Sequence, residues 1–452
     1  MTSADKASGI GSGASAAATA SASGEEAALN RKWLLSETQL DECRTRANRE
    51  GVRYLQKLVA FQTSAGGGDG AKDTKAESKP EPSVKWFASG YAQRCLDGDN
   101  NDDDEMEVDQ DDEDKSANTA SVDLPNPPLT PEEELLLVQF YSGKIPDLIG
   151  PAAVLSRLRR DVKVTATASA LFRRFYLSNS VMTHDPKAMM VACAFLASKV
   201  EDATVDIRYL EEATKQMQAP VTQTEIIDAE MALVSGVHFE LLCFHPYKTV
   251  LAYTEDLRTY LKTDRGKVLA TFPPGNEDRP VIGEDLRPMH DEARRVVDDA
   301  CVSDVILLAS PGQIGLAAMV VANEDLQAEQ EKRKQAKTGG AGEEEELQRP
   351  VVPKIDLLGY LDSRFADQGD KKARQELRSQ ISETCDMLRA LRDGKYGCGN
   401  HGIDMVKLKE VHKKWKKCRG GAEKTKKKKK KKRKAEEGGD GESEAKKVKA
   451  SA

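Results

Sequence analysis

Two cysteines and two histidines near the C-terminus have the clearest potential for chemistry, because thiolate and imidazole groups are the ligands that zinc prefers in structural sites. They are Cys398, His401, His412 and Cys418, separated by two, ten and five intervening residues. This spacing matches no common zinc finger, and the glycines at 397, 399 and 402 favour a mobile loop over a rigid ligand shell. We therefore expect no metal site and no cofactor.

The sequence also lacks the motifs of enzymatic catalysis. The glycine-rich stretch 9–13 lies in a low-complexity terminus with no following strand pattern, so it is not a phosphate-binding loop. We find no HRD or DFG motif of a kinase, no HExxH motif and no nucleophile elbow. None of the six histidines is paired with a recognisable nucleophile. We therefore expect a binding or regulatory protein and not an enzyme.

Composition limits how much of the 452-residue chain can be compact. Only 39% of the residues are hydrophobic and 5% aromatic, whereas 32% are charged, which favours two compact domains with polar segments around them. The longest apolar run, at 188–197, has ten residues where a membrane span needs about 20. The N-terminus has no pattern of a signal or transit peptide, and eight cysteines without a CxxC pair indicate reduced thiols. We expect a cytosolic or nuclear protein with no membrane partner.

The net charge of −7 conceals two strongly charged segments. Residues 97–114 contain twelve Asp or Glu and no Lys or Arg, whereas residues 413–434 contain fifteen Lys or Arg and one Glu. The acidic run is expected either to shield a basic partner or to fold back on the basic tail, and the second hypothesis is motivated by opposite charge alone.

A run of nine basic residues in this tail is typical of a nuclear import signal, and a nuclear location is expected. A solubilising tail, or one that attracts nucleic acid without specificity, is the alternative. Because no aromatic residues interrupt the run, specific recognition of nucleic acid is not expected. The candidate import residues are Lys426, Lys427, Lys428, Lys429, Lys430, Lys431, Lys432, Arg433 and Lys434.

Helix start signals and apolar patterns predict an almost entirely helical protein. Capping boxes begin at Ser36 and Thr222, and Thr130 precedes a proline and two glutamates. The first of these signals predicts a helix through about residue 52. Five helices are expected between residues 130 and 237, and the one that contains the apolar run 188–197 is expected at the centre of a bundle.

The second half of the chain repeats this pattern. An apolar, alanine-rich helix expected at 311–323 aligns with the central helix when Pro186 is set against Pro311. Further helices are expected at 246–261, 288–303, 355–365 and 371–391. Polar stretches at 263–285 and 325–352 are predicted to be loops between them.

Two adjoining stretches of the first bundle resemble the cyclin box. They are FRRFYLSNSVM at 172–182 and AFLASKVED at 194–202. SETQL at 36–40, HPY at 245–247 and SPGQI at 310–314 extend the resemblance to residues 33–60 and 130–395. The sequence is most similar to the H type of the cyclin family, with the C type as the nearest alternative.

The resemblance implies an all-α protein with two tandem five-helix cyclin folds, flanking N- and C-terminal helices, and disordered insertions and tails. The expected organisation is 1–30 disordered, 31–62 N-terminal helix, 63–128 disordered acidic insertion, 129–242 first cyclin fold with the cyclin box, 243–396 second cyclin fold with insertions at 263–285 and 325–352, and 397–452 C-terminal helix and basic tail.

The resemblance also implies a function. Cyclins bind a cyclin-dependent kinase and hold it in its active form. For the H type, the expected partners are the kinase and the assembly factor of the CDK-activating kinase, together with subunits of transcription factor IIH. The expected substrates are the activation loops of other kinases and the C-terminal repeats of RNA polymerase II. Alternatives are a cyclin C-like Mediator subunit and a cyclin-fold transcription scaffold that binds nucleic acid through its basic tail.

Two residues match the positions that face the kinase in cyclins. They are Lys199, in the segment AFLASKVED, and Glu230, in the last helix of the first fold. The resemblance implies that the pair hydrogen-bonds the C-helix and the adjoining loop of the kinase. Without the resemblance, Lys199 would be read as a cation at the negative end of its helix and Glu230 as a solvated residue.

Overall fold

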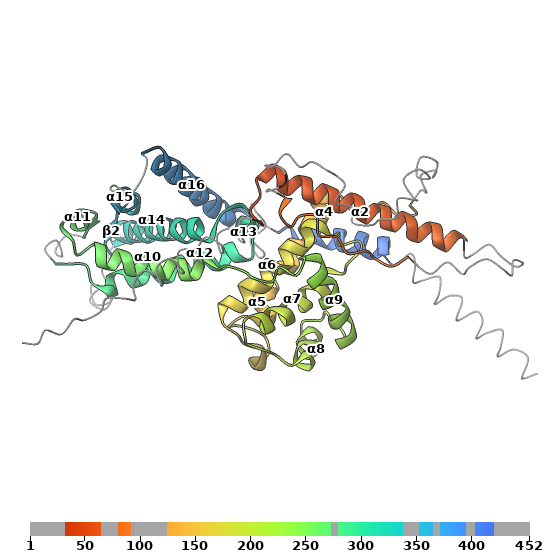
Figure 1. Cartoon of the computed structure of the whole chain (residues 1–452). Coiled ribbons are helices and arrows are strands. Elements are labelled where there is room, and N and C mark those ends of the chain that lie inside the picture. The colour runs from red at the N-terminus through yellow and green to blue at the C-terminus, as the bar shows by residue number, and fades with distance from the viewer. Residues whose placement is uncertain are drawn as a thin grey trace, which may run out of the picture.

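Helices make up nearly all the secondary structure of the protein. The computed structural model describes residues 32–64, 80–91, 94, 124–272, 279–337, 352–364, 371–394 and 403–419. The described helices form two bundles, and each bundle has its own apolar core (Figure 1). The residues expected to be disordered at 1–30, and the basic run 426–434, lie outside the described residues.

The first bundle is built around α7 (Pro186–Val200), as the apolar run predicted. Along α7 the small residues Ala192, Cys193, Ala194 and Ala197 are completely buried, which lets neighbouring helices approach closely. The helices that contact α7 are α4 (Pro131–Ser142), α5 (Ile145–Ile149), α6 (Val162–Ser178), α8 (Ile207–Gln216) and α9 (Gln223–Gly236). A short 3-10 turn, η2 (Ser156–Leu158), packs against α8.

The second bundle has the same plan around α14 (Pro311–Lys337). Its residues Ala317, Ala318 and Ala322 are completely buried, like the alanines of α7. Both central helices begin at the prolines that the sequence alignment paired. The remaining helices are α10 (Pro246–Tyr260), α11 (Asp264–Lys267), α12 (Gly283–Cys301), α13 (Val305–Leu308), α15 (Leu357–Arg364), α16 (Lys371–Ala390) and η3 (Leu391–Asp393).

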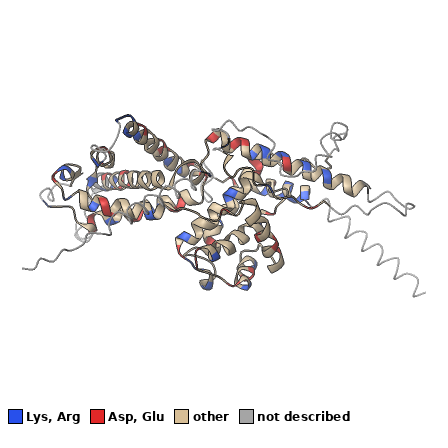
Figure 2. Ribbon diagram, viewed as in Figure 1, with Lys and Arg blue, Asp and Glu red and all other residues tan. Residues whose placement is uncertain are grey.

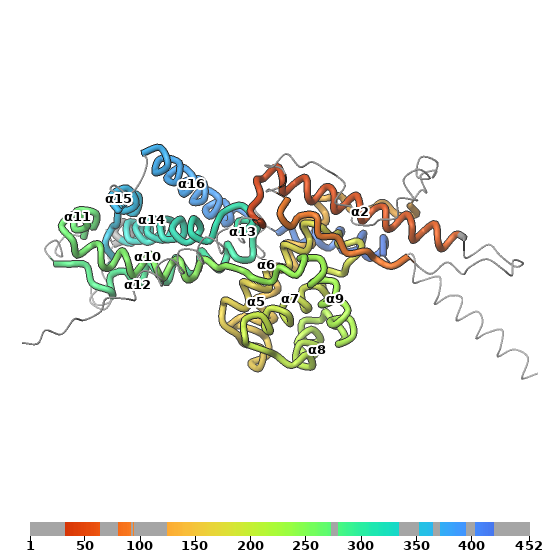
Figure 3. Tube along the Cα trace, viewed as in Figure 1, coloured from red at the N-terminus to blue at the C-terminus, as the bar shows by residue number. Residues whose placement is uncertain are grey.

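Three segments outside the bundles cover the first bundle. They are α2 (Glu37–Ser64), residues 80–91 and the helix at 405–419. Leu55 of α2 and Trp415 of the last helix belong to the same core cluster as α7, although they are far apart in the sequence. Figure 3 shows the last helix, in blue, close to the red α2. The N- and C-terminal flanking helices therefore complete the first bundle.

A buried charge network joins the two bundles. Asp304, between α12 and α13, accepts from Arg44 of α2 at 2.8 Å and from Arg173 of α6. Arg173 also donates to the backbone oxygen of Val302. Burial opposes ionisation of Asp304, but the two arginines outweigh burial and hold the pKa of its carboxyl below the ordinary value. The network therefore connects α2 and both bundles through one ionised side chain.

The structure corrects several expectations about loops. Residues 80–91, assigned to the disordered insertion, pack on the first bundle: Asn179 exchanges hydrogen bonds with the Lys85 backbone at 2.9 and 2.7 Å, and the Trp86 ring stacks on His238 at 4.1 Å. α2 continues past residue 52 to Ser64, and α14 continues past residue 323 to Lys337. The start of the loop predicted from 325 is therefore wrong. The late residues of α14 are mostly Ala, Glu, Gln and Lys, which have high helix propensity.

The loop predicted at 263–285 also contains ordered structure. It includes α11, and strand β1 (Ala270–Thr271) pairs with β2 (Lys354–Ile355) in an antiparallel ladder. α12 begins at Gly283 and not at Pro288, because the Asp285 carboxylate accepts from the Ile282 backbone amide at 2.9 Å and pairs with Arg279 at 2.6 Å. No helix of the described residues is long and apolar enough to cross a membrane.

Candidate kinase-docking site

The two residues expected to face a kinase lie together on the first bundle. Lys199, in the last turn of α7, places its Nζ atom 2.6 Å from Oε1 of Glu230 on α9. The same Nζ atom lies 3.8 Å from the centre of the Phe195 ring, one turn earlier on α7. The Lys199 side chain is 42% exposed and that of Glu230 is 15% exposed. The pair therefore lies at the surface, with Lys199 open to solvent.

The position of Lys199 is fixed by the turn that follows α7. Asp202 adopts a left-handed backbone with φ of 52°, and the Ala203 amide donates back to the Ser198 carbonyl at 2.8 Å. The guanidinium of Arg160 donates to the carbonyls of Ala203 and Thr204 at 2.8 and 2.9 Å. These contacts hold the end of α7 in place.

A buried polar cluster supports the same helix end. Thr167 donates to Glu201 at 2.6 Å and contacts Nε2 of His245 at 2.7 Å. Burial lowers the pKa of His245 to about 4, although Glu201 opposes this shift. At neutral pH His245 is therefore uncharged, and the cluster adds no positive charge beside Lys199.

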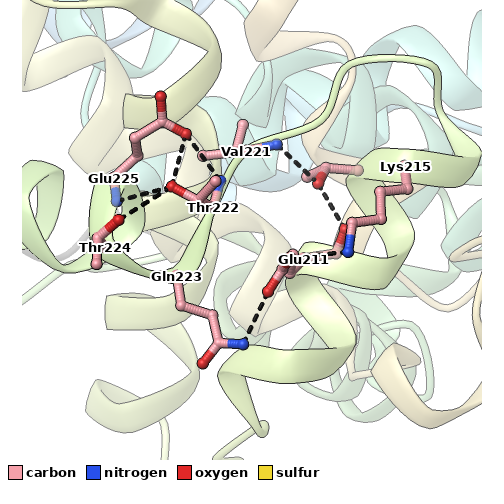
Figure 4. Close-up of polar contacts among 8 residues, drawn as sticks. Glu211, Lys215, Val221, Thr222, Gln223, Thr224 and Glu225 are labelled. Carbon is pink, nitrogen blue, oxygen red and sulfur yellow. Dashed lines mark hydrogen bonds and ion pairs between the residues drawn. The ribbon is translucent and has the colours of Figure 1, made fainter. Parts of the chain in front are cut away.

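The start of α9 is fixed by the predicted capping box. Thr222 Oγ1 accepts from the Glu225 amide at 3.4 Å, and Glu225 accepts from the Thr222 amide at 2.8 Å (Figure 4). Gln223 ties this turn to α8 by donating to Glu211 at 2.7 Å. The N-terminal end of α9 is therefore anchored before the turn that carries Glu230.

The end of α9 depends on Gly236. A Cβ atom at this position would lie 2.5 Å from a Phe175 ring carbon and 3.1 Å from a Val84 methyl group. α9 therefore approaches α6 and the segment 80–91 more closely than any larger residue permits.

We expect Gly236→Ala to lower the free energy of unfolding by about 1 to 3 kcal/mol, because the new methyl group displaces α9 from Phe175. Chemical denaturation followed by circular dichroism measures the effect. Gly283→Ala is the matched control, since its Cβ atom meets nothing nearer than 3.6 Å. Equal stabilities of the two variants would show that the end of α9 can move without cost.

Apolar side chains flank the polar pair, and the sequence analysis did not identify them. Ile227 and Met231 of α9 are 50% and 70% exposed. Ile227 and Met231 are four residues apart, so they lie one above the other on α9, and Ile227 lies one turn before Glu230. The sequence carried a signal for Ile227 and Met231, because these two apolar residues lie outside the face of α9 that Ile226 and Leu233 bury. A surface that combines exposed apolar side chains with an accessible ion pair is suited to binding a partner.

The four cysteines and histidines considered for zinc are not brought together as a described site. Cys398 and His401 lie outside the described residues. His412 packs edge-on against Phe140, Tyr141 and Trp415, and Cys418 donates to the carbonyl of Pro127 at 3.1 Å. Within the described ranges no three His, Cys, Asp or Glu residues group to hold a metal ion.

Comparison with known families accounts for both bundles. The N-terminal cyclin domain matches residues 153–242, and the C-terminal cyclin domain matches residues 245–390. Cyclin CCL1 of Saccharomyces cerevisiae is 32% identical over 199 residues, which are 44% of this chain and 44% of that protein. Cyclin-H1-1 of Arabidopsis thaliana is 27% identical over 196 residues, or 43% of this chain and 51% of that protein. The matched region thus spans about half the length of these relatives.

A solved structure supports the fold independently. A chain in the CAK complex of Chaetomium thermophilum bound to ATP-gamma-S superposes with a TM-score of 0.53 at 20% identity, and the alignment covers 86% of this chain and 85% of that chain. The predictions of an all-α protein with two tandem cyclin folds, and of similarity to cyclin H, are confirmed. Because the two domain matches follow one another in order and together cover just over half of the chain, the chain belongs to the cyclin family.

Proposed function

We propose that this cyclin binds a cyclin-dependent kinase through the surface formed by Lys199, Glu230, Ile227 and Met231, and that it is a non-catalytic regulatory subunit. The observation that supports this proposal most directly is a solvent-accessible ion pair on the helix that also carries two exposed apolar side chains. We call these four residues the docking surface.

The energetics of the docking surface suit reversible binding. An ion pair with one partner 42% exposed contributes at most about 1 kcal/mol to stability, because solvent screens it. Lys199 and Glu230 can therefore exchange their mutual hydrogen bond for contacts with backbone groups of a partner at little cost. Ile227 and Met231 lose exposed apolar area on binding, which supplies affinity that the polar groups do not.

The proposed consequence for the kinase is a shift between two conformations. A cyclin that binds the kinase C-helix only in its active position favours that position by its difference in affinity. The C-helix then supplies the glutamate of the lysine–glutamate ion pair that phosphoryl transfer requires. In this proposal all catalytic groups belong to the kinase, and the cyclin contributes binding free energy.

The relatives support a more specific assignment. We infer that the chain is the cyclin of a nuclear CDK-activating kinase that includes an assembly factor and joins transcription factor IIH. Its kinase then phosphorylates activation loops of other kinases and the C-terminal repeats of RNA polymerase II. The names of the cyclin H relative and of the CAK complex support this inference, and the basic run at 426–434 is consistent with nuclear import.

The proposal is tested with the full chain purified together with its kinase, whose identity mass spectrometry gives. We expect Lys199→Ala combined with Glu230→Ala to weaken kinase binding by about tenfold to a hundredfold, because a polar clamp at an interface is lost. Met231→Ala should also weaken binding, while leaving stability unchanged because the side chain is exposed. Binding and phosphorylation of a polymerase-repeat peptide are measured in parallel.

A second exposed ion pair provides the matched control. Arg389 and Glu324 of the second bundle lie 2.5 Å apart, with side chains 43% and 53% exposed. We expect their double replacement by alanine to leave kinase binding and activity unchanged. Undiminished binding in the Lys199 and Glu230 double variant would disprove the docking surface, and co-purification of a Mediator kinase would replace the assignment to the CDK-activating kinase.

A further inference from the structure

The helix at 405–419 has two faces of different character. Leu408, Val411 and Trp415 are buried in the core of the first bundle, and the indole N–H of Trp415 donates to the Val181 carbonyl at 2.9 Å. The Asp404 side chain accepts from the amides of residues 406 and 407 at 2.8 and 3.2 Å, which caps the helix. The helix is therefore a fixed part of the fold with one face turned to solvent.

Four exposed lysines occupy the solvent face of this helix. They lie at positions i, i+4, i+7 and i+8, so they fall on one side of the helix, opposite the buried residues. We name this set the lysine face: Lys409, Lys413, Lys416 and Lys417. Figure 2 colours the lysines and arginines of the described helices blue.

The lysine face has one acidic neighbour on its own helix, Glu410, and no ion pair in the described ranges joins the face to an acidic residue. Two other basic residues of the helix, outside the lysine face, make ion pairs. Lys414 pairs with Glu133 at 2.5 Å, and Arg419 pairs with Asp185 at 3.3 Å. None of the four lysines makes an ion pair with an acidic residue in the described ranges. Like charges three or four residues apart destabilise a helix by about 0.2 to 0.5 kcal/mol per pair. A polyanion that covers the face would relieve this repulsion.

The described part of the chain resumes at residue 124, after the acidic segment, and it does so beside this face. Leu124 packs on the first core, Asn126 donates to the carbonyl of Lys417 at 3.4 Å, and Cys418 donates to the carbonyl of Pro127 at 3.1 Å. The described residues 124–127, which follow the acidic segment in the sequence, therefore lie next to the C-terminal end of the helix. Residues 102–114 carry ten Asp or Glu, and only nine residues, 115–123, separate them from Leu124.

Chain length permits contact along the whole helix. Nine residues span at most about 30 Å when extended, whereas a 15-residue helix is about 22 Å long. A short tether of this kind gives an effective local concentration on the order of millimolar. An external polyanion at lower concentration therefore competes at a disadvantage.

We propose that the acidic segment 102–114 docks on the lysine face of the helix at 405–419. The contact is electrostatic, between carboxylates and ammonium groups, so it weakens as salt rises. When docked, the segment screens the lysine face from nucleic acid and from acidic proteins.

The test compares the full-length protein with a variant in which every Asp and Glu of 102–114 is changed to Asn and Gln. Lysine acetylation by a water-soluble reagent, read by mass spectrometry, reports the accessibility of each amine. At low ionic strength we expect the four lysines of the wild type to react at least about threefold more slowly than in the variant. At about 1 M salt, where the Debye length is about 3 Å, the difference should disappear.

Lys248 and Lys262 are exposed lysines of the second bundle and serve as internal controls, because their rates should match in both proteins. Carbodiimide cross-links between 102–114 and the lysine face are the expected positive signal. Equal acetylation rates of the two proteins at low salt would overturn the proposal. Protection of the four lysines from acetylation that disappears on dilution would instead assign the face to a second copy of the chain. Protection that appears only when an oligonucleotide is added, and equally in both proteins, would assign the face to nucleic acid.

Discussion

Asp304→Ala is expected to lower the free energy of unfolding by about 3 to 5 kcal/mol, because it removes one partner of a buried ion pair. The carboxylate is shared by Arg44 at 2.8 Å and by Arg173, whose side chain is only 1% exposed. Without Asp304, the buried guanidinium of Arg173 loses its carboxylate, and the Ser142 hydroxyl and the Val302 carbonyl remain beside it. The cost of removing one partner from a buried ion pair exceeds the net stabilisation that the intact pair provides.

Denaturation by guanidinium chloride, followed by circular dichroism, measures this effect. Trp33 lies in the cluster that joins α2 to Leu307 of the second bundle, so its fluorescence reports the junction when Trp86 and Trp415 are replaced by phenylalanine in both proteins. Glu324→Ala, in an exposed ion pair, is the control and should cost at most about 1 kcal/mol. If Asp304→Ala costs no more than this control, the network does not hold the bundles together.

The contribution of Asp304 also has a defined pH dependence. Because its folded pKa lies below the ordinary value, its stabilisation is present above the ordinary carboxyl range and is lost as the pH falls through the folded pKa. The wild type and the variant should therefore converge in stability in acid.

The second prediction concerns Glu134, a carboxyl group buried where α2, α4 and the loop after α6 meet. It accepts from the Asn48 amide at 2.7 Å, from the Ser180 hydroxyl at 2.9 Å and from the Val181 backbone amide at 2.9 Å. Burial raises the pKa of Glu134 to about 7, although these hydrogen bonds oppose the shift. The group is therefore half protonated in the folded protein near neutral pH.

We expect the stability advantage of the wild type over Glu134→Gln to fall by about 3 kcal/mol as the pH rises from about 4.5 to about 8, and to level off above that. The sign follows from the raised pKa: between these pH values the folded state holds a proton that the unfolded state has released. The stabilisation by Glu134 is fully present below the pKa of the unfolded state, and it is lost as the pH rises through the pKa of the folded state. Glutamine cannot release a proton, so it lacks this dependence.

Comparing the two proteins is necessary because a histidine acts in the opposite direction. Burial lowers the pKa of His184 to about 4, so its contribution is lost as the pH falls from about 6.5. Denaturation of both proteins at several pH values between about 5 and 8 isolates the effect of Glu134. Glu284→Gln, on the surface of α12, is the control, because it shows how much the change from glutamate to glutamine alters stability where the side chain is exposed. A stability difference between wild type and Glu134→Gln that does not change with pH would show that Glu134 stays ionised.

Local patterns predicted the elements, whereas contacts between distant residues were not predictable. The capping boxes at Ser36, Thr130 and Thr222 and the apolar run of α7 are local signals, and the structure contains each of them. β1 and β2 are two residues long and pair across 85 positions, so they leave no periodic pattern. The docking of residues 80–91 was missed because their contacts are with residues 178, 179 and 238, far along the chain.

The candidate site shows the same limit. Lys199 and Glu230 lie on different helices, and only the family resemblance connected them before the structure placed their side chains 2.6 Å apart. Glu134 follows an N-terminal proline and two other glutamates, a setting that usually indicates a solvated helix start. Its burial depends on α2, whose packing no local pattern reveals.

The buried ion pairs between the bundles also have a consequence for folding during synthesis of the chain. Arg44 and Arg173 are synthesised long before Asp304, 260 and 131 positions earlier in the sequence. A nascent first bundle therefore carries two guanidinium groups whose carboxylate has not yet been made. A fragment that ends before residue 304 would therefore keep Arg173 without the carboxylate that pairs with it in the folded protein, and we expect it to be less stable than the same bundle in the full chain.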